Sequence, residues 1–532
     1  METLMPLPLT LFVYKCPLYT YNLGKIVETK ITRFDGGMKN DPRDPSPNTC
    51  RVCTNFDALT NPYKLTPYPN SESGDSAPTT SRKQNFVIAL RTGATFSLYA
   101  LGVVSGAGTA EVLFKDLTTG ASNDLDDNGW STPANNQSAS GATAFDLFIY
   151  YRKVNLIFGA RAGTHIWAFN AGSAFADTHQ ALTYTTIRQG LVHTEDDILY
   201  IPYFDSAAPT SAVASNNNGS WDTTALSLPK HLIPQSLCES GNYLAIGCGP
   251  DTGAVLGDSK VILWDRDSIS WNEMFDAGDG DLRVLEELSG NLVTISLAGN
   301  ATTRRKNKVN FRVITSAGIQ NLLTLESTSS IQLLTRKQKL NDRVYFMMSI
   351  TIDGVVREGV WSFGRNDAGQ WALIHERTPN NDTALTGGVL NGFIFVGDYL
   401  FQSFVDDSAY NLTKTNDQEA YATAIYETKK YNAGDSSLKK DLVGITVTTE
   451  PLDDSPAASV VVKYKKDNET SFTTILTHDT DGAISDSAVN IEASAVALPK
   501  NYREISYRLE STGAEVTGFS FKEEIVGGRN YD

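Results

Sequence analysis

Cysteine, methionine and histidine are scarce in this sequence of 532 residues, which contains five, six and six of them respectively. Five cysteines do not make a disulfide framework in a chain of this length. Cys50 and Cys53 form one C-x-x-C pair, but the other three cysteines supply no second pair for a zinc site. We therefore predict that the pair fills ordinary strand or loop positions, and a metal or redox role is the alternative.

Long hydrophobic runs are missing as well. The most apolar early stretch, Leu4 to Tyr14, contains Pro6 and Pro8. At about eleven residues it is shorter than the roughly 20 apolar residues that span a bilayer. Glu2 precedes it, whereas a signal peptide begins with positive charge. The sequence thus predicts neither a secretion signal nor membrane insertion.

Positive charge is in the minority, because 45 Lys and Arg residues stand against 61 Asp and Glu, for a net charge of −16. A nucleic-acid-binding chain presents a basic face to the phosphates. Attachment to an anionic membrane surface needs the same sign of charge. The balance disfavours both functions for the chain as a whole and leaves only local basic patches as candidates.

Motifs for catalysis are also lacking. The sequence contains no G-x-S-x-G elbow for a nucleophilic serine, no metal-ligand spacing among its histidines and no glycine-rich phosphate loop. Acidic residues are frequent, but nothing indicates that two of them face each other across a pocket, as glycoside hydrolysis requires. We therefore predict that the protein is not an enzyme and needs no cofactor.

One acidic segment matches the first half of a calcium-binding loop. Asp124, Asp126 and Asn128 stand at alternate positions and are followed by a glycine, as in the loop of a helix-loop-helix calcium site. The twelfth position is Asn135 instead of a bidentate glutamate, and Pro133 intervenes. We expect an acidic hairpin turn, and a weak cation site is the alternative.

The middle of the chain contains an internal repeat. Each unit has an apolar strand, a polar turn that often carries glycine, and an aromatic residue that opens another strand, as in the segment Asp367 to Trp371. Seven marker positions follow one another at intervals of 45, 46, 50, 50, 50 and 50 residues: Trp130, Phe175, Trp221, Trp271, Asn321, Trp371 and Tyr421. Asn321 breaks the aromatic rule, but the apolar strand expected before it, Phe311 to Ile314, is present.

Four short strands in a unit of this length are typical of a β-propeller blade. The 41 glycines, 20 prolines and 10% aromatic residues also favour many short strands and turns. We therefore predict an all-β fold with a seven-bladed β-propeller over residues 84–430, and six or eight blades remain open. A chance alignment of aromatic residues is the alternative interpretation.

The two ends of the chain differ from the middle. Residues 431–532 contain alternating runs such as Leu442 to Thr448 and Ser459 to Tyr464, which predict a small C-terminal β-sandwich. Residues 1–83 are rich in proline and serine, for example from Asp41 to Pro47. We predict an extended N-terminal arm that straps the ring or reaches a neighbour.

Two basic clusters lie in the expected connections of adjacent repeat units. They are candidates for contact with an acidic neighbouring protein or with nucleic acid, and solvated loops are the alternative. The candidate residues are Arg304, Arg305, Lys306, Lys308, Arg336, Lys337 and Lys339.

Four short motifs follow one another near the N-terminus: Ile31-Thr-Arg-Phe-Asp-Gly-Gly37, Asn40-Asp-Pro-Arg43, Val52-Cys-Thr-Asn-Phe-Asp57 and Tyr63-Lys-Leu65. This region resembles the opening of large tail proteins of tailed bacteriophages, and the layout of propeller and terminal sandwich resembles that of phage tail nozzle, tubular or adaptor proteins. The resemblance implies a non-enzymatic structural component of the virion tail, assembled in the host cytoplasm. It also implies a homo-oligomeric ring that contacts other tail proteins, such as adaptor and fibres, and meets DNA only in transit. No functional residue carries over.

The expected function is therefore that of a tail nozzle or adaptor protein that forms a ring or docks fibres. An acidic inner surface suits this role, because it lets DNA slide without binding it. Two alternatives stay open: a carbohydrate- or receptor-binding propeller, including a glycoside hydrolase, and a host intracellular propeller that serves as an interaction platform.

Overall fold

The computed structural model describes residues 24–39, 48–73, 82–91, 95–104, 110–116, 147–161, 163–170, 174–250, 257–299, 306–380, 384–397, 399–415, 421–452, 458–479 and 498–527. These residues form β-strands and one 3-10 turn, η2 (Arg152–Val154). Among them, no helix has the length and apolar character needed to cross a membrane. The prediction of an all-β fold is confirmed.

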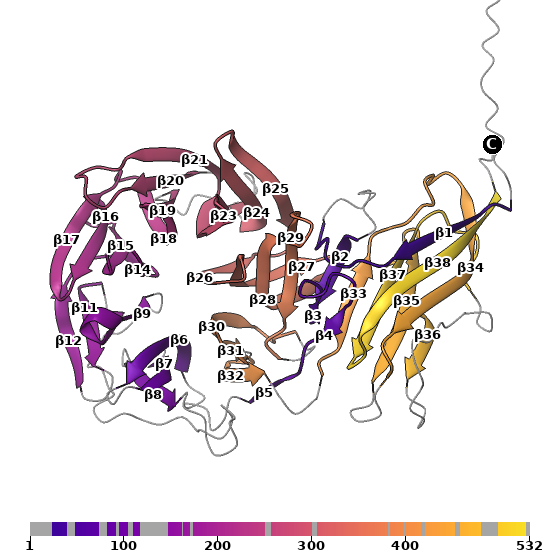
Figure 1. The fold of residues 1–532 in the computed structure, drawn as a ribbon, viewed down its shortest axis with the longest axis horizontal. Helices are drawn as coiled ribbons and strands as arrows, with labels where there is room; N and C mark the ends of the chain where they lie inside the picture. The colour runs from indigo at the N-terminus through magenta and orange to yellow at the C-terminus, as the bar shows by residue number, and fades with distance from the viewer. Residues whose placement is uncertain are drawn as a thin grey trace, which may run out of the picture.

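The middle of the chain forms a ring of sheets, each made of strands consecutive in the sequence (Figure 1). The first three sheets contain β6 (Arg82–Arg91), β7 (Thr95–Val104) and β8 (Ala110–Asp116); β9 (Phe148–Tyr151), β10 (Leu156–Arg161), β11 (His165–Asn170) and β12 (Ala174–Ala181); and β13 (Thr186–Ile187), β14 (Leu191–His193), β15 (Ile198–Asp205), β16 (Thr210–Asn217) and β17 (Ser220–Ser227). The next two contain β18 (Leu232–Ser240), β19 (Tyr243–Pro250), β20 (Asp258–Trp264) and β21 (Glu273–Asp279); and β22 (Asp281–Leu288), β23 (Asn291–Gly299), β24 (Lys306–Thr315) and β25 (Gly318–Glu326). The sixth contains β26 (Gln332–Leu340), β27 (Arg343–Ile352), β28 (Val355–Arg365) and β29 (Trp371–Arg377), and the seventh contains β30 (Val389–Val396), β31 (Tyr399–Asp406) and β32 (Ala409–Thr415). This arrangement is that of a β-propeller.

Short turns produce the repeat seen in the sequence. Asn218 and Gly219, with φ angles of 51° and 89°, join β16 to β17, and Asn217 pairs with Ser220. Two residues with positive φ are what a tight hairpin needs, because their twist matches that of the flanking strands. Trp221 follows this turn in the last strand of its sheet.

The other described marker positions lie at similar places. Phe175, Asn321 and Trp371 lie in the last strands β12, β25 and β29, and Trp271 comes just before β21. Tyr421 differs, because it forms an isolated bridge with Pro69 instead of opening a last strand.

The seventh sheet receives its fourth strand from the N-terminal part of the chain. Strand β5 (Ser71–Ser73) pairs antiparallel with β32, with Ser73 opposite Thr413 and Ser71 opposite Thr415. Such pairing covers a sheet edge that would otherwise expose free backbone groups. The ring is therefore closed by residues that precede all its other strands, within the segment predicted as an extended arm.

Aromatic side chains fill the space between neighbouring sheets of the ring. The rings of Phe311 in the fifth sheet and Phe346 in the sixth lie 6.2 Å apart, and those of Tyr200 and Trp264 link the third and fourth sheets at 5.8 Å. Buried aromatic pairs of this kind contribute both apolar area and a preferred geometry.

A second body lies beside the ring and consists of two packed sheets (Figure 1). One sheet contains β1 (Ile26–Ile31), β38 (Val516–Gly527) and β34 (Lys439–Thr449); the other contains β2 (Cys50–Thr54), β33 (Ala424–Thr428), β37 (Ile505–Thr512), β35 (Ser459–Lys466) and β36 (Thr473–Asp479). Tyr507 packs between the sheets against Phe521, at 4.6 Å between ring centroids, and against Phe519, at 5.2 Å. A small hairpin of β3 (Phe56–Asp57) and β4 (Thr66–Pro67) accompanies them.

The second body thus draws strands from three of the predicted segments. Strands β1 and β2 come from the predicted arm, and β33 comes from the end of the range predicted for the propeller. Strands β1 and β2 pair with β38 and β33, which lie hundreds of residues away in the sequence, so local composition does not reveal the pairing.

One sheet joins the ring to the second body. Strand β29 at the outer side of the sixth sheet pairs in parallel with β2, with Thr54 opposite His375, which makes a continuous sheet of nine strands. His375 is fully buried and stacks on Trp361 at 4.5 Å. Its Nε2 donates to the carbonyl oxygen of Glu358 at 3.1 Å, so its Nδ1 accepts from the Thr54 hydroxyl at 3.1 Å. Burial lowers the pKa of His375 to about 3, so the imidazole in this seam is neutral.

A buried carboxylate fixes the N-terminal segment beside this seam. Glu376 accepts hydrogen bonds from the Tyr68 hydroxyl at 2.7 Å and from the Ser362 hydroxyl, and Arg343 donates to Ser362 at 2.7 Å. The guanidinium of Arg377 lies 4.0 Å from the centre of the Tyr68 ring. Burial raises the pKa of Glu376, because the charged form loses its hydration. The segment is therefore held to the ring by polar contacts as well as by strand pairing.

Candidate functional site

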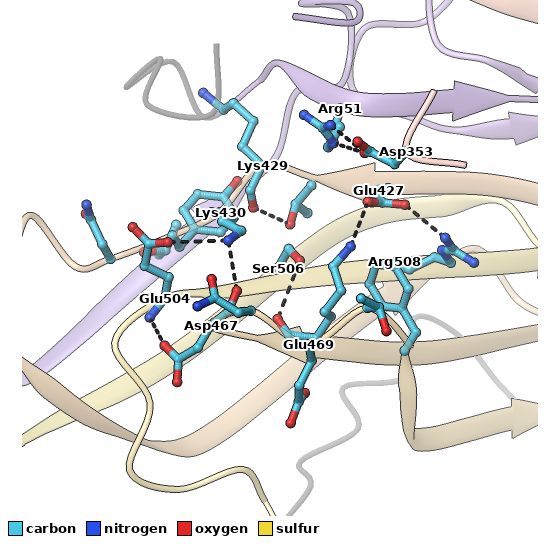
Figure 2. Close-up of a pocket in the computed structure, with 18 of the residues that line it drawn as sticks. Arg51, Asp353, Glu427, Lys429, Lys430, Asp467, Glu469, Glu504, Ser506 and Arg508 are labelled. Atoms are coloured by element: carbon cyan, nitrogen blue, oxygen red, sulfur yellow. Dashed lines mark hydrogen bonds and ion pairs between the residues drawn. The ribbon is translucent and has the colours of Figure 1, made fainter. Parts of the chain in front are cut away.

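A cleft of about 1070 Å³ lies between the ring and the second body (Figure 2). The ring contributes Asp353 and Arg357, from the hairpin of β27 and β28. The second body contributes residues of β33, β35 and β37 and of the connections that follow β33 and β35. Because the nine-stranded sheet contains both walls, their relative positions are fixed by backbone hydrogen bonds.

Strand alternation places charged side chains on the cleft face of the second body. Tyr426 and Leu509 are buried in the core and pair across β33 and β37. The next residues along these strands point to the opposite face. There Glu427 and Arg508 are register partners that face each other, as Figure 2 shows.

Glu427 is the central carboxylate of the cleft. It is 3% exposed, and its two oxygens pair with Arg508 at 3.0 Å and with Lys465 at 3.8 Å. Two cations therefore share one carboxylate. Arg508 has a second acidic neighbour, Glu510, at 3.7 Å.

Two further ion pairs lie at the sides of the cleft. Arg51 donates to the Asp353 carboxylate at 2.6 Å, and Asp353 sits in a tight two-residue turn with φ of 53°. Lys430 lies 3.5 Å from the Glu504 carboxylate and donates to the carbonyl oxygen of Asp467 at 2.8 Å. These side chains are partly exposed, so their ion pairs exchange with solvent at low cost.

The cleft is more cationic than the rest of the molecule. Its cationic side chains are Lys39, Arg51, Arg357, Lys429, Lys430, Lys465 and Arg508, and its acidic side chains are Asp353, Glu427, Asp467, Glu469 and Glu504. Cations outnumber carboxylates here, whereas in the whole chain 61 acidic residues stand against 45 basic ones. The cleft is therefore a local site of positive charge on an acidic protein.

An aromatic ring supports two of these cations. The guanidinium carbon of Arg508 lies 4.1 Å from the centre of the Phe472 ring, and Lys465 Nζ lies 4.5 Å from it. A cation over an aromatic face is attracted by the ring quadrupole and loses side-chain freedom. Phe472 thus keeps both charges on the cleft face of the sheet.

Arg357 lies deep in the cleft and is 7% exposed. Burial lowers its pKa to about 10, and the nearby Glu427 carboxylate opposes this shift, so the guanidinium stays charged at neutral pH. Its Nη1 donates to the Thr54 hydroxyl at 3.4 Å. Its Nε, like that of Arg508, is buried without a hydrogen-bond partner among the described residues.

This chemistry suits the binding of anionic groups. Guanidinium groups bind carboxylates and phosphates through two parallel hydrogen bonds. Within the described ranges, no group of three or more His, Cys, Asp or Glu side chains is arranged to hold a metal ion. The carboxylates of Asp353, Glu427 and Glu504 are each paired with a cation.

The predicted basic cluster from Arg336 to Lys339 lies elsewhere. These residues belong to β26, the first strand of the sixth sheet, so the prediction that they lie in a connection is wrong. Lys337 donates to the carbonyl oxygen of Leu237 at 2.8 Å and pairs with Glu286 at 2.8 Å. A break in register between Leu333 and Lys337 gives these side chains access to other sheets of the ring.

The other members of that cluster are also used inside the ring. Arg336 donates to the Asn85 side chain in β6, and loss of hydration lowers its pKa to about 9. Lys339 donates to the carbonyl oxygen of Glu287 at 2.5 Å. The three cations therefore connect sheets of the ring to one another and are not displayed on a loop for a partner.

The first basic cluster is described only in part. Arg304 and Arg305 lie outside the described residues, and Lys306 begins β24. Lys308 lies in the same strand and pairs with Glu326 of β25 at 2.7 Å. The described residues of the two clusters thus lie in strands of neighbouring sheets, β24 and β26.

Of the calcium-loop and cysteine candidates, the structure describes only the cysteine pair. Asp124, Asp126 and Asn128 lie outside the described residues, so that site stays a prediction. Cys50 and Cys53 are buried free thiols in β2. A hydrogen bond with Cys50, together with burial, raises the pKa of Cys53 well above its usual range, which leaves it an unreactive thiol.

Sequence reasoning did not single out the residues of the cleft. Charges stand two residues apart at Lys463 and Lys465 and at Glu427 and Lys429. That alternation indicates a charged sheet face. The contact between Glu427 and Arg508 could not be predicted in this way, because it depends on β33 and β37 being neighbours in the sheet.

No protein-family model and no curated protein sequence matches the chain. Among the solved structures that are similar to it, two have low sequence identity. The β-propeller domain of Cps50 (Swd1) from Myceliophteria thermophila has 8% identity and a TM-score of 0.39, over 64% of this chain and 98% of that chain. Hydrazine synthase from Kuenenia stuttgartiensis has 12% identity and a TM-score of 0.36, over 50% of this chain and 77% of that chain. These likenesses concern the fold alone, and the propeller assignment rests on the ring of sheets itself.

Proposed function

We propose that the chain is a non-enzymatic structural component of a tailed-phage virion, a tail nozzle or adaptor protein that forms a ring of copies or docks fibres. The observation that carries this proposal is the nine-stranded sheet, which joins a propeller and a second body in one fixed orientation. A protein that positions its neighbours needs two surfaces held rigidly to each other, and a shared sheet provides this.

The residues that resemble phage tail proteins take part in this join. The main-chain nitrogen of Met38 donates to the carbonyl oxygen of Leu373 in β29 at 2.8 Å. Gly37 has a φ of 68°, and a Cβ added there would lie 2.7 Å from the Cβ of Ala372. A glycine is therefore required for the close approach of this segment to the ring. Phe34 packs against Tyr426 of the second body, at 5.4 Å between ring centroids.

The function is tested on the particles themselves. Mass spectrometry of purified virions from cells that carry the gene should detect the chain at a stoichiometric copy number. Negative-stain imaging of the purified protein should show rings of several copies, because symmetric assembly is the usual route to such components. A monomeric protein that is absent from virions, or one that cleaves glycans, would refute the proposal.

The alternative of a carbohydrate-binding propeller predicts acidic and aromatic side chains around the centre of the ring. Lys337 and Gln338 of β26 donate to carbonyl oxygens of neighbouring sheets, and neither side chain is acidic or aromatic. A glycan array separates the two functions, since the structural role predicts no bound glycan.

A further inference from the structure

We propose that the cleft lined by Arg357, Lys465 and Arg508 is the docking site for an acidic peptide segment of a neighbouring protein. The inference deepens the proposed function and rests on it only for the presence of a neighbour in an assembly.

Two buried guanidinium N–H groups in the cleft lack a partner. The Nε atoms of Arg357 and Arg508 are buried, and neither has a hydrogen-bond partner among the described residues. A buried donor without a partner loses its hydration and gains nothing in return. A carboxylate that enters the cleft brings acceptors for such donors.

Positive charge in the cleft also exceeds what its own carboxylates neutralise. Glu427 is shared by Arg508 at 3.0 Å and Lys465 at 3.8 Å, and its charge also acts on Arg357. One lining carboxylate therefore serves three cations, of which Arg508 also has Glu510 at 3.7 Å. An incoming carboxylate meets a local excess of positive charge.

The size and charge pattern favour a peptide over phosphate or nucleic acid. A volume of about 1070 Å³ accommodates several residues of an extended chain, whereas a phosphate ion fills a small part of it. The cationic side chains that line the cleft are not confined to the group around Glu427, because Arg51 and Lys430 also line it. Asp467, Glu469 and Glu504 line it as well, so the cleft does not present the continuous basic surface that a row of phosphates requires.

We assign the cleft to a neighbour of another sequence, because a short acidic segment brings carboxylates to the cleft without the net charge of −16 of a whole copy. Occupancy by a second copy of this chain is an outcome of the test.

Glu427 has a distinct part in this binding. It occupies the position between Lys465 and Arg508 that a carboxylate of the peptide would share, so it competes with the incoming group. Its removal leaves the cations free for the ligand. The variant Glu427→Gln should therefore bind an acidic peptide more tightly than the wild type, an effect that no folding defect produces.

The test uses the full-length chain and a fluorescein-labelled hexaglutamate peptide, with binding followed by fluorescence anisotropy at low and high salt. We expect saturable binding that weakens as salt increases. Lys465→Gln and Arg508→Gln should each weaken it about tenfold, the worth of one charge-assisted hydrogen bond. The matched control is Lys463→Gln, because Lys463 is two residues from Lys465 on the same strand but pairs with Glu510 at 2.5 Å outside the cleft.

Several results would overturn the proposal. They are the absence of saturable binding, equal weakening by Lys463→Gln, and weaker binding by Glu427→Gln. Displacement of the peptide by millimolar inorganic phosphate, or tighter binding of an oligonucleotide, would assign the cleft to phosphate. Sedimentation of the wild type as a dimer that Arg508→Gln dissociates would assign it to a second copy.

The outcome stays separate from that of the proposed function. A chain that is absent from virions but binds the peptide with this mutational pattern keeps the cleft assignment and loses the phage role. A chain that is present in virions without peptide binding does the reverse. If Arg508→Gln fails to fold, Lys465→Gln and Glu427→Gln still decide, because they change affinity in opposite directions.

Discussion

The neutral histidine in the seam between the ring and the second body makes stability sensitive to acid. His375 has an ordinary pKa of 6.5 and a pKa of about 3 in the folded chain, because it is fully buried. Between pH 6.5 and pH 3 this residue is protonated in the unfolded chain and neutral in the folded chain. Stability from this group is therefore complete above pH 6.5 and is lost as the pH falls towards 3.

The size of the effect follows from the shift. One pKa unit corresponds to about 1.4 kcal/mol, so the loss reaches about 1 kcal/mol at pH 5.5 and about 3 kcal/mol at pH 4.5. The perturbation is His375→Gln, which keeps an acceptor for Thr54 and a donor for the carbonyl of Glu358 but does not titrate. Other titrating groups contribute equally to both proteins and cancel in the comparison.

The assay is urea denaturation at pH 7.5, 6.5, 5.5 and 4.5, followed by tryptophan fluorescence. The wild type should lose stability relative to His375→Gln as the pH falls, by the amounts given above. The matched control is His231→Gln, because His231 is exposed just before β18. Parallel pH dependences of the wild type and His375→Gln would refute the reasoning, since they would mean that protonation costs nothing at the seam.

Two further predictions concern the ring. A Cβ at Gly159 would overlap the ring of Trp167, so Gly159→Ala should reduce the free energy of unfolding by about 1–3 kcal/mol. The control is Gly444→Ala, which should have little effect because the nearest contact of the added Cβ is at 3.7 Å. Denaturant midpoints and melting temperatures of the two variants are compared. Lys337→Met leaves the Glu286 carboxylate buried without its cation and should cost about 3–5 kcal/mol, most of which a second change, Glu286→Leu, should recover in a double-mutant cycle. Equal melting temperatures for the two glycine variants, or a double mutant no more stable than Lys337→Met alone, would contradict these predictions.

Features encoded within a few residues were predictable from the sequence. The turn of Asn218 and Gly219 and the strand that carries Trp221 follow from local chemistry, because a tight hairpin needs positive φ at its central residues. Repetition of such hairpins indicated a propeller. Tyr421 continues the interval of 50 residues but pairs with Pro69, so a regular interval alone does not identify the last strand of a sheet.

Features that depend on distant pairing were not predictable in this way. Nothing near Ser71 indicates that it pairs with Thr415, because the two are separated by most of the ring. The same holds for the cleft, whose central contact joins Glu427 to Arg508. The cations from Arg336 to Lys339 were predicted in an exposed connection, because charged residues are usually exposed. They lie instead in a strand, and Arg336 and Lys337 donate to other sheets of the ring, which the sequence does not indicate.

The placement of the early strands has a consequence for biosynthesis. Strands β1, β2 and β5 are made before the strands with which they pair, β38, β33 and β32. The ring cannot close before β32 (Ala409–Thr415) has been made, and the second body cannot be completed before β38 (Val516–Gly527) has been made. Domains that fold during synthesis are protected from aggregation by their early completion. In this chain the early strands stay unpaired until their partners have been made, and the ring can close before the second body because β32 precedes β38 in the sequence.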